Sequence, residues 1–282
     1  MLKLLNKLKA AYVSVYLTVA SLISAYAVWS LVQTEYTLAW AGTLLAAAPM
    51  AIVIGFLMIK PIMARTSADL PEAHIPIALG VILTVWADSP DWQPLVLALI
   101  SYAGFLLYVY WYSRYGRVAS DALATGKALP DFTLKDTDGN NVSSRELCSK
   151  PSVILFYRGN WCPLCMAQIK EIAAQYQEIE TLGAQVILVS PQPHKNTREL
   201  ADKFDVNFRF MTDSGNQAAR ILGIASDFGI PTGLEAMGYD SEAPMPTVII
   251  TDASGKVVWT HETDNYRVRP EPETFLKVIR AL

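Results

Sequence analysis

Charged residues are scarce in the first 112 residues of this chain of 282. Glu35 is the only charged residue between Lys9 and Lys60, and none occurs between Asp91 and Arg114. The rest of the chain carries charge at an ordinary globular frequency, which indicates an apolar part followed by a water-soluble part. The formal net charge of −3 gives no reason to expect nucleic-acid binding.

The apolar part contains four segments that predict membrane-spanning helices, because about 20 apolar residues cross the hydrocarbon core of a bilayer. They lie near residues 11–33, 38–59, 72–88 and 94–112. The third segment is marginal in length, so length alone leaves its crossing open. The last segment ends in YVYWY, which suits the aromatic belt at a membrane interface.

Charge placement favours four crossings over three. Four crossings put the flanking lysines and arginines on one side and Glu35, Asp88 and Asp91 on the other, as the positive-inside rule predicts. Three crossings would strand Arg114 and Arg117 outside. We therefore predict a multi-pass inner-membrane protein with both ends cytoplasmic. A cleaved signal peptide is the alternative for the first segment, but its apolar core is too long and further spans follow.

The predicted domain organisation follows from these patterns. Residues 1–112 form an all-α transmembrane region, and the polar, Gly- and Ala-rich stretch 113–129 forms a linker. Residues 130–282 form a cytoplasmic domain.

Cysteine is also scarce. The chain has three, and none precedes Cys148. Three cysteines exclude the disulfide framework of a secreted domain, and their placement excludes thiol exchange along the membrane segments. Cys148 is interpreted as a small hydrophobic residue at a helix end. Cys162 and Cys165, in contrast, lie three residues apart in WCPLC.

The soluble part alternates strand and helix patterns, which predicts an α/β sheet covered on both faces. Residues 131–143 predict a hairpin, and Ser143 with Glu146 predicts a capping box. The apolar runs 152–157 and 185–190 predict strands that are buried on both faces. The C-terminal part predicts a strand, a helix stopped by glycine, a closing hairpin and a final helix.

Two helices are predicted between these strands. A stripe from Cys165 to Ile179 predicts one helix that ends at Gly183. Asn196 with Glu199 predicts the start of the next one.

The cysteine pair lies where a buried strand, a turn and a helix follow one another. Cys162 is at the helix tip, where free N–H groups and the helix dipole favour a thiolate, and Pro163 fits the first helical turn. This placement predicts Cys162 as an exposed attacking thiol and Cys165 as a shielded resolving thiol. A zinc site needs more ligands than one CxxC supplies, and inert core cysteines would not explain a Trp-Cys-Pro turn. We predict redox chemistry, with no metal and no other cofactor.

The motifs of the soluble part occur in the order and spacing of one family. They are LPDFTLKDTDGNNVSSREL, ILFYRGNWCPLC, VILVSP, RFMTDS, PTVIITDASGKVV and YRVRPEPETFL. Residues 130–282 resemble the peroxiredoxin-like branch of the alkyl hydroperoxide reductase and thiol-specific antioxidant (AhpC/TSA) family, within the thioredoxin superfamily. The resemblance does not cover the apolar part. It implies a thioredoxin-like α/β fold.

The resemblance also implies roles for particular residues. Cys162 matches the peroxidatic cysteine, whose thiolate attacks a peroxide, becomes a sulfenic acid and condenses with a second thiol. Arg267 or Arg269 matches an arginine that the family places near the thiolate, where it stabilises negative charge. The alternative for these arginines is a solvated surface pair. Pro246 matches the proline that is cis in thioredoxin-like folds.

One position departs from the family pattern. Gly159 stands where peroxiredoxins generally have a threonine or serine whose hydroxyl holds the peroxide. Trp161 and the CxxC spacing are shared with thioredoxins, which exchange disulfides with proteins. The candidates for substrate positioning are Arg158, Asn160, Trp161, Pro163 and Pro246.

These observations predict a membrane-anchored thiol-dependent peroxidase that reduces hydroperoxides through the CxxC pair. Proximity to the bilayer favours lipid or other organic hydroperoxides. The predicted partners are a thioredoxin-type or other thiol reductant, a hydroperoxide and the lipid bilayer. One alternative is a membrane-tethered thiol:disulfide oxidoreductase acting on protein disulfides, and another is a redox sensor in which the CxxC state alters a membrane partner.

Overall fold

The computed structural model describes residues 2–33, 35–87 and 89–282, which form two compact units. The helical unit consists of Ala11–Lys60 and Thr66–Arg114. The sheet unit consists of Tyr115–Leu282 with Pro61–Arg65 and the first residues through Ala10. Asp88, which the charge pattern places on the side of Glu35, lies outside the described residues.

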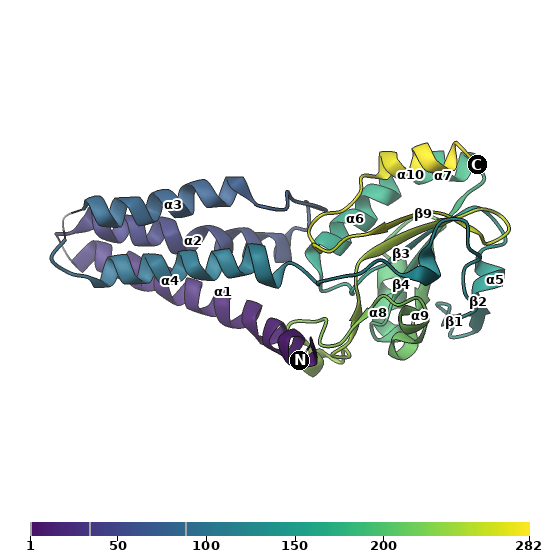
Figure 1. Ribbon diagram of the computed structural model, residues 1–282, viewed down its shortest axis with the longest axis horizontal. Coiled ribbons are helices and arrows are strands. Elements are labelled where there is room, and N and C mark those ends of the chain that lie inside the picture. The colour runs from purple at the N-terminus through teal and green to yellow at the C-terminus, as the bar shows by residue number, and fades with distance from the viewer. Residues whose placement is uncertain (1, 34, 88) are drawn as a thin grey trace. The chain divides into compact units, whose positions relative to one another are not determined.

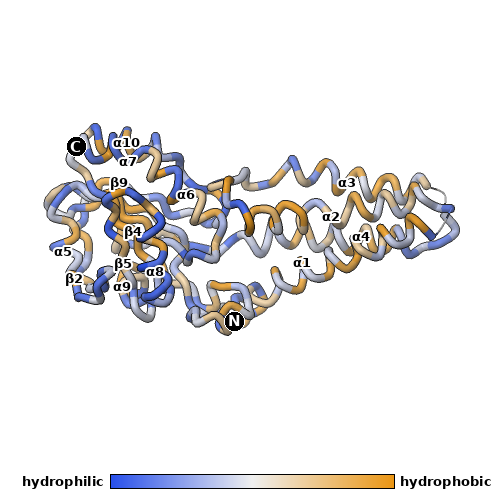
Figure 2. Tube along the Cα trace, turned by 180° about the vertical axis from the view of Figure 1, so that it is seen from behind, coloured by the Kyte–Doolittle hydropathy of each residue, from blue (hydrophilic) through white to orange (hydrophobic). Residues whose placement is uncertain are grey.

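Four helices contain the apolar segments: α1 (Leu2–Gln33), α2 (Thr37–Ile59), α3 (Pro71–Trp86) and α4 (Gln93–Leu107), which continues as a π-helical turn, η1 (Tyr108–Tyr112). Figure 2 shows hydrophobic residues along all four helices. Three stretches are long and apolar enough to cross a membrane: Lys3–Gln33, Thr37–Ile59 and Gln93–Tyr112. With 16 residues α3 is shorter than these, so the fourth crossing stays a prediction.

The helical unit packs through small residues where α2 meets α3. A Cβ atom added to Gly80 would lie 2.6 Å from the backbone nitrogen of Ala46 and 2.6 Å from the carbonyl oxygen of Gly42. The two backbones therefore approach closely, as small residues allow in membrane helices. The hydroxyl of Thr43 donates to the carbonyl of Pro94 at 2.9 Å, which joins α2 to the start of α4.

The sheet unit is built on seven strands in the order β2-β1-β5-β4-β3-β8-β9. Their bounds are β1 Thr133–Lys135, β2 Asn141–Ser143, β3 Ser152–Phe156, β4 Gln185–Ser190, β5 Arg209–Thr212, β8 Thr247–Thr251 and β9 Val257–Glu262. Strands β3, β4 and β5 are parallel, and β8 and β9 continue the sheet as an antiparallel hairpin. A separate ladder pairs β6 (Ala225–Ser226) with β7 (Ala243–Pro244).

Helices cover both faces of this sheet (Figure 1). The helices α6 (Pro163–Ala174), α7 (Tyr176–Thr181) and α10 (Pro272–Ile279) lie on one face, and α8 (His194–Ala201) and α9 (Gln217–Ile221) lie on the other. All five residues of β3 are buried, as its apolar run predicts. The parallel β3-α6-α7-β4 unit followed by an antiparallel hairpin confirms the predicted thioredoxin-like α/β fold.

The predicted hairpin, the Ser143 cap and the place of Cys148 at a helix end are confirmed. The hairpin pairs β1 with β2, and the hydroxyl of Ser143 accepts from the N–H of Glu146 at 3.2 Å to cap the short helix α5 (Ser144–Leu147). Cys148 is 3% exposed and ends that helix.

Two helix predictions are wrong in detail. The helix expected to run through to Gly183 breaks at Gln175, after which Tyr176 packs edge-on against Phe208 with ring centroids 5.4 Å apart. Helix α8 begins at His194 instead of near Asn196, because the side chain of Asn196 bonds Tyr239 at 2.9 Å instead of capping the helix.

From Tyr115 onward, the residues that connect the apolar segments to β1 are part of the sheet unit. The short 3₁₀ helix η2 (Asp121–Leu123) buries Leu123 at 1% exposure. The guanidinium of Arg117 donates to Glu262 on β9 at 2.8 Å, in an ion pair that is almost fully buried. The predicted domain boundaries stay a prediction, but the predicted linker is not a free tether over these residues.

Candidate active site

The CxxC pair lies at the N-terminus of α6, directly after the loop that follows β3. Cys162 is the N-cap residue, and its Sγ accepts from the N–H of Cys165 at 3.4 Å. Pro163 is the first helical residue, as its sequence position predicts. A thiolate here is stabilised by free N–H groups and by the positive end of the helix dipole.

Both sulfurs are buried. Cys162 is 2% exposed and Cys165 is fully buried, so the prediction of an exposed Cys162 is wrong. The Sγ of Cys162 is turned toward the backbone of α6, and the side chain of Arg269, from the segment before α10, lies against it. The sequence predicts a residue at the helix tip, but it does not predict what the rest of the chain lays over that tip.

The side chain over the sulfurs is Arg269. Its guanidinium lies 3.4 and 3.5 Å from the Sγ of Cys165, measured from Nη2 and Nη1, and 3.9 Å from the Sγ of Cys162. Its Nε donates to the carbonyl of Tyr266 at 3.0 Å. Arg267 is also buried, and its N–H donates to Asn265 at 3.1 Å. A solvated surface pair is therefore wrong for both arginines.

The two thiols are electrostatically coupled. Burial raises the pKa of Cys162, and the neighbouring Cys165 raises it further. Burial opposes ionisation of Cys165 as well, but the hydrogen bond from the Cys162 thiol and the charge of Arg269 outweigh it and hold the pKa of Cys165 well below its usual range. The pair thus holds one negative charge readily and resists a second.

Arg158 and Trp161 form a stack beside the pair. The Arg158 guanidinium carbon lies 4.6 Å from the centroid of the Trp161 ring and 5.3 Å from that of Tyr266, within the range of cation–π contact. Arg158 also donates to the carbonyl of Gly229. Its charge favours a thiolate at Cys162.

Gly159 has a conformational requirement that accounts for the missing hydroxyl. Its φ is +145°, in the region that favours glycine, and a Cβ atom would lie 2.8 Å from the Trp161 ring. A threonine or serine at this position would be strained. The family's hydroxyl is therefore incompatible with this loop conformation.

Asn160 fastens the loop instead of facing an open site. Its N–H donates to Gln192 at 2.8 Å, and the hydroxyl of Tyr239 donates to its side-chain oxygen. Gln192 in turn donates to the hydroxyl of Tyr157 at 3.1 Å. Gln192 and Tyr239 are missed by sequence reasoning, because no motif links them to the cysteine loop.

Pro246 is buried just before β8, and its carbonyl accepts from Arg117 at 3.3 Å. No peptide bond between described residues is cis, so the expectation of a cis bond at Pro246 is wrong.

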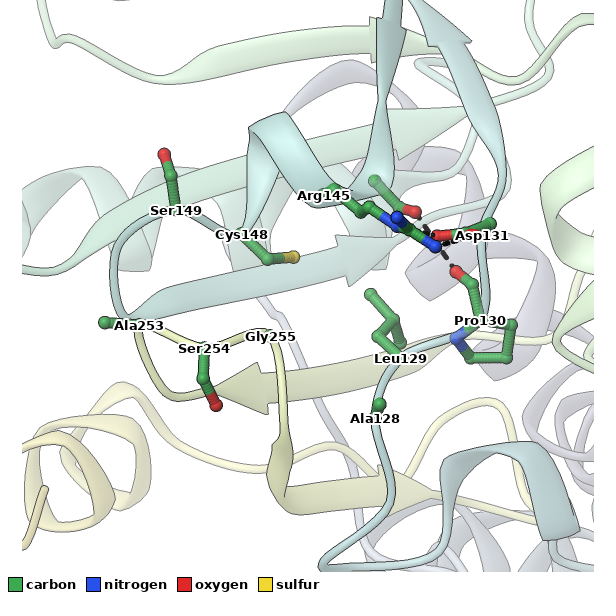
Figure 3. Close-up of a pocket in the computed structure, with 11 residues that line it drawn as sticks. Ala128, Leu129, Pro130, Asp131, Arg145, Cys148, Ser149, Ala253, Ser254 and Gly255 are labelled. Carbon is green, nitrogen blue, oxygen red and sulfur yellow. Dashed lines mark hydrogen bonds and ion pairs between the residues drawn. The ribbon is translucent and has the colours of Figure 1, made fainter.

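A cavity of about 590 Å³ lies at the other end of β3 (Figure 3). It is lined by the residues around Cys148, whose thiol points into it, with Arg145 and Asp131 paired at one side. Burial raises the pKa of Cys148. Because β3 has five residues at about 3.3 Å each, this cavity is separate from the CxxC pair.

The sheet unit is similar to known proteins. The AhpC/TSA family model matches residues 125–260. Chloroplastic peroxiredoxin Q of Gentiana triflora is 31% identical over 127 residues, which are 45% of this chain and 58% of that protein. Chloroplastic peroxiredoxin Q of Sedum lineare is 31% identical over 124 residues, which are 44% of this chain and 67% of that protein. The crystal structure of peroxidoxin BcpB from Mycobacterium tuberculosis is 18% identical, covering 58% of this chain and 99% of that one, with a TM-score of 0.48.

Proposed function

The chain belongs to the AhpC/TSA family, and we propose that it is a membrane-anchored thiol-dependent peroxidase that uses Cys162 and Cys165. The observation that carries the proposal is one buried guanidinium, that of Arg269, within 4 Å of two buried thiols at a helix N-terminus. This arrangement stabilises negative charge on sulfur and on the oxygen that leaves a peroxide.

The reaction starts from the pair with one proton shared between its two sulfurs. When that proton lies on Cys165, the Cys162 thiolate attacks the terminal oxygen of the hydroperoxide and the O–O bond breaks. The leaving alkoxide takes up a proton from solvent and departs as the alcohol, so Cys165 keeps its proton. Cys162 is then a sulfenic acid. The thiol of Cys165 condenses with it to form a disulfide and water, and an external thiol reductant reduces the disulfide.

Arg269 is proposed as the catalytic arginine, since it lies against both sulfurs. Arg158 adds positive charge beside Cys162, and Trp161 forms the adjoining wall. Asn160 holds the loop through its hydrogen bonds. Arg267 and Pro246 are then supporting residues.

The anchor sets the proposed location and substrate class. We propose that the apolar helices cross the inner membrane four times, with the sheet unit on the cytoplasmic side. Lipid or other organic hydroperoxides are the proposed substrates, and a thioredoxin-type or other thiol compound is the proposed reductant. The motivation for a lipid substrate is proximity to the bilayer.

The second candidate is a thiol:disulfide oxidoreductase that acts on protein disulfides. The WCPLC spacing favours it because thioredoxins share that spacing, and Gly159 favours it because glycine supplies no hydroxyl to hold a peroxide. The burial of both sulfurs favours the peroxidase, since the terminal hydroperoxide group of a substrate reaches a buried thiol more easily than a disulfide within a folded protein does.

One experiment separates the two candidates. The full-length protein, reduced and in detergent micelles, is mixed with substoichiometric hydrogen peroxide, cumene hydroperoxide or a disulfide substrate, and its thiols are counted over time. Fast loss of two thiols with either peroxide, absent in Cys162→Ser, supports the peroxidase. Peroxide reaction no faster than that of a free thiol, with rapid reduction of the disulfide, assigns the chain to the second candidate.

A further inference from the structure

Gln168 lies on α6 next to the guanidinium that faces the sulfurs. It is 1% exposed, and its Oε1 accepts from Nη1 of Arg269 at 2.9 Å. The same Nη1 lies 3.5 Å from the Sγ of Cys165. Cys165 and Gln168 are three residues apart on one helix and so share a face, which places the amide one step below the sulfur.

The contact fixes where the guanidinium lies. Arg269 is held at Nε by the carbonyl of Tyr266 and at Nη1 by Gln168. The fork between these two anchors presents Nη1 and Nη2 to the sulfurs. Without the amide oxygen, the carbonyl of Tyr266 would be the one oxygen acceptor left to the guanidinium among the described residues, and the guanidinium could rotate away from the sulfurs.

The nitrogen of the Gln168 amide, Nε2, lies in an unfavourable environment. Arginine has only donors, so Oε1 of Gln168 must face Arg269, and this leaves Nε2 pointing elsewhere. Nε2 is buried and has no hydrogen-bond partner among the described residues. Buried amide groups in native proteins are nearly always paired, so an unpaired one calls for a reason.

A carboxylate at this position would avoid the unpaired donor and would bind the arginine more strongly. It would also neutralise the arginine and compete with the thiolate for its charge. A neutral acceptor holds Arg269 and leaves its positive charge available to sulfur. The unpaired Nε2 is the structural cost of that arrangement.

We infer that Gln168 is a positioning residue that holds Arg269 against the sulfurs of Cys162 and Cys165 as a neutral hydrogen-bond acceptor. Its contribution to catalysis rests on the proposed peroxidase function, whereas its effect on thiol ionisation does not. The thiols of Cys162 and Cys165 face each other and Arg269. The other titratable and charged groups near these three residues are Arg158, Tyr157, Tyr115 and His261.

The test compares Gln168→Glu and Gln168→Leu with the wild type in the full-length protein in detergent. The matched control is Gln177→Glu, the same substitution at an exposed position of α7. Iodoacetamide alkylation of the reduced protein across pH, read by mass spectrometry of the cysteine peptide, gives the apparent pKa of the first ionisation. Hydrogen peroxide consumption is measured in parallel, and thermal melting monitors the fold.

Gln168→Glu is expected to raise the apparent thiol pKa by about 1–3 units, the shift that a nearby opposite charge typically causes and that its neutralisation removes. The peroxide rate at pH 7 falls with the thiolate fraction, which drops about tenfold for each unit by which the pKa rises above 7. Gln168→Leu keeps the charge but loosens the arginine, so the peroxide rate falls with a smaller pKa shift. Gln177→Glu changes neither quantity.

A folded Gln168→Glu variant with the wild-type thiol pKa overturns the inference. If that variant does not fold, a folded Gln168→Leu variant with wild-type pKa and rate overturns it. A wild-type protein that consumes no peroxide, together with a raised thiol pKa in Gln168→Glu, removes the proposed function and supports the positioning role.

Discussion

Replacing Arg269 by methionine removes the positive charge nearest to the CxxC pair and keeps an unbranched side chain of moderate length. The charge lies 3.4 Å from the Sγ of Cys165 and 3.9 Å from that of Cys162 at its nearest atoms, and the whole guanidinium is buried. We expect the first ionisation of the pair to become harder, because no other cation lies against both sulfurs among the described contacts.

The size of the effect follows from distance and dielectric. Two unit charges about 4 Å apart interact by about 4 kcal/mol at an effective dielectric constant of about 20. That energy corresponds to about 3 pKa units, since one unit is about 1.4 kcal/mol. Solvent entering the vacated space reduces it, so we expect a rise of about 1–3 units, the size of the shift found for a carboxylate beside an arginine. The alkylation rate at neutral pH falls by the same factor as the thiolate fraction.

The assay follows alkylation of the reduced full-length protein across pH, with two comparison variants. Arg269→Lys keeps the charge but loses the forked geometry, so its pKa shift lies between that of the wild type and that of Arg269→Met. Arg280→Met removes an exposed arginine paired with Glu178 and leaves the thiol pKa unchanged. A folded Arg269→Met protein with the wild-type thiol pKa would refute the electrostatic account of this site.

Three further predictions concern the backbone, the helical unit and pH. Gly159→Thr is expected to cost about 1–3 kcal/mol of stability and to lower peroxide turnover. Gly159→Ala should have the same effect, because the backbone φ of +145° and not the absent hydroxyl decides the outcome. Higher peroxide turnover in the threonine variant would contradict this. Gly80→Ala is expected to lower the melting temperature because the added methyl group forces α2 and α3 apart. Gly55→Ala, where nothing lies within 4 Å of the added Cβ atom, leaves the melting temperature unchanged or raises it. Equal changes in the two variants would argue against close packing of α2 and α3. In the reduced protein, the lowered pKa of Cys165 adds stability as the pH rises toward about 8.5, the pKa of an unperturbed cysteine. The raised pKa of Cys162 removes stability as the pH rises above about 8.5. The contribution of the pair to the melting temperature therefore has a maximum near pH 8.5, which a double cysteine-to-serine variant lacks.

The sequence predicts much of the local structure because local structure follows from local patterns. Apolar runs of sufficient length predict the helices α1, α2 and α4, and the buried run 152–157 predicts β3. The order of strand, Trp-Cys-Pro turn and helix predicts where Cys162 lies on α6. Helix boundaries at Gln175 and Asn196 are predicted wrongly, since there a tertiary contact outweighs the local signal.

The chemistry around the sulfurs depends on contacts that no local pattern encodes. The YRVRP motif offers two arginines, and only the packing of the segment before α10 brings Arg269 to residues about a hundred positions earlier in the chain. The same packing buries Cys162, which its place at a helix tip predicts to be exposed, and it pairs Arg269 with Gln168. The sequence by itself determined the thiol pair and the helix that favours its ionisation, because both are properties of neighbouring residues. Only the tertiary structure decided which charge faces the pair and what holds that charge in place, because electrostatic interactions depend on distance in space and on burial.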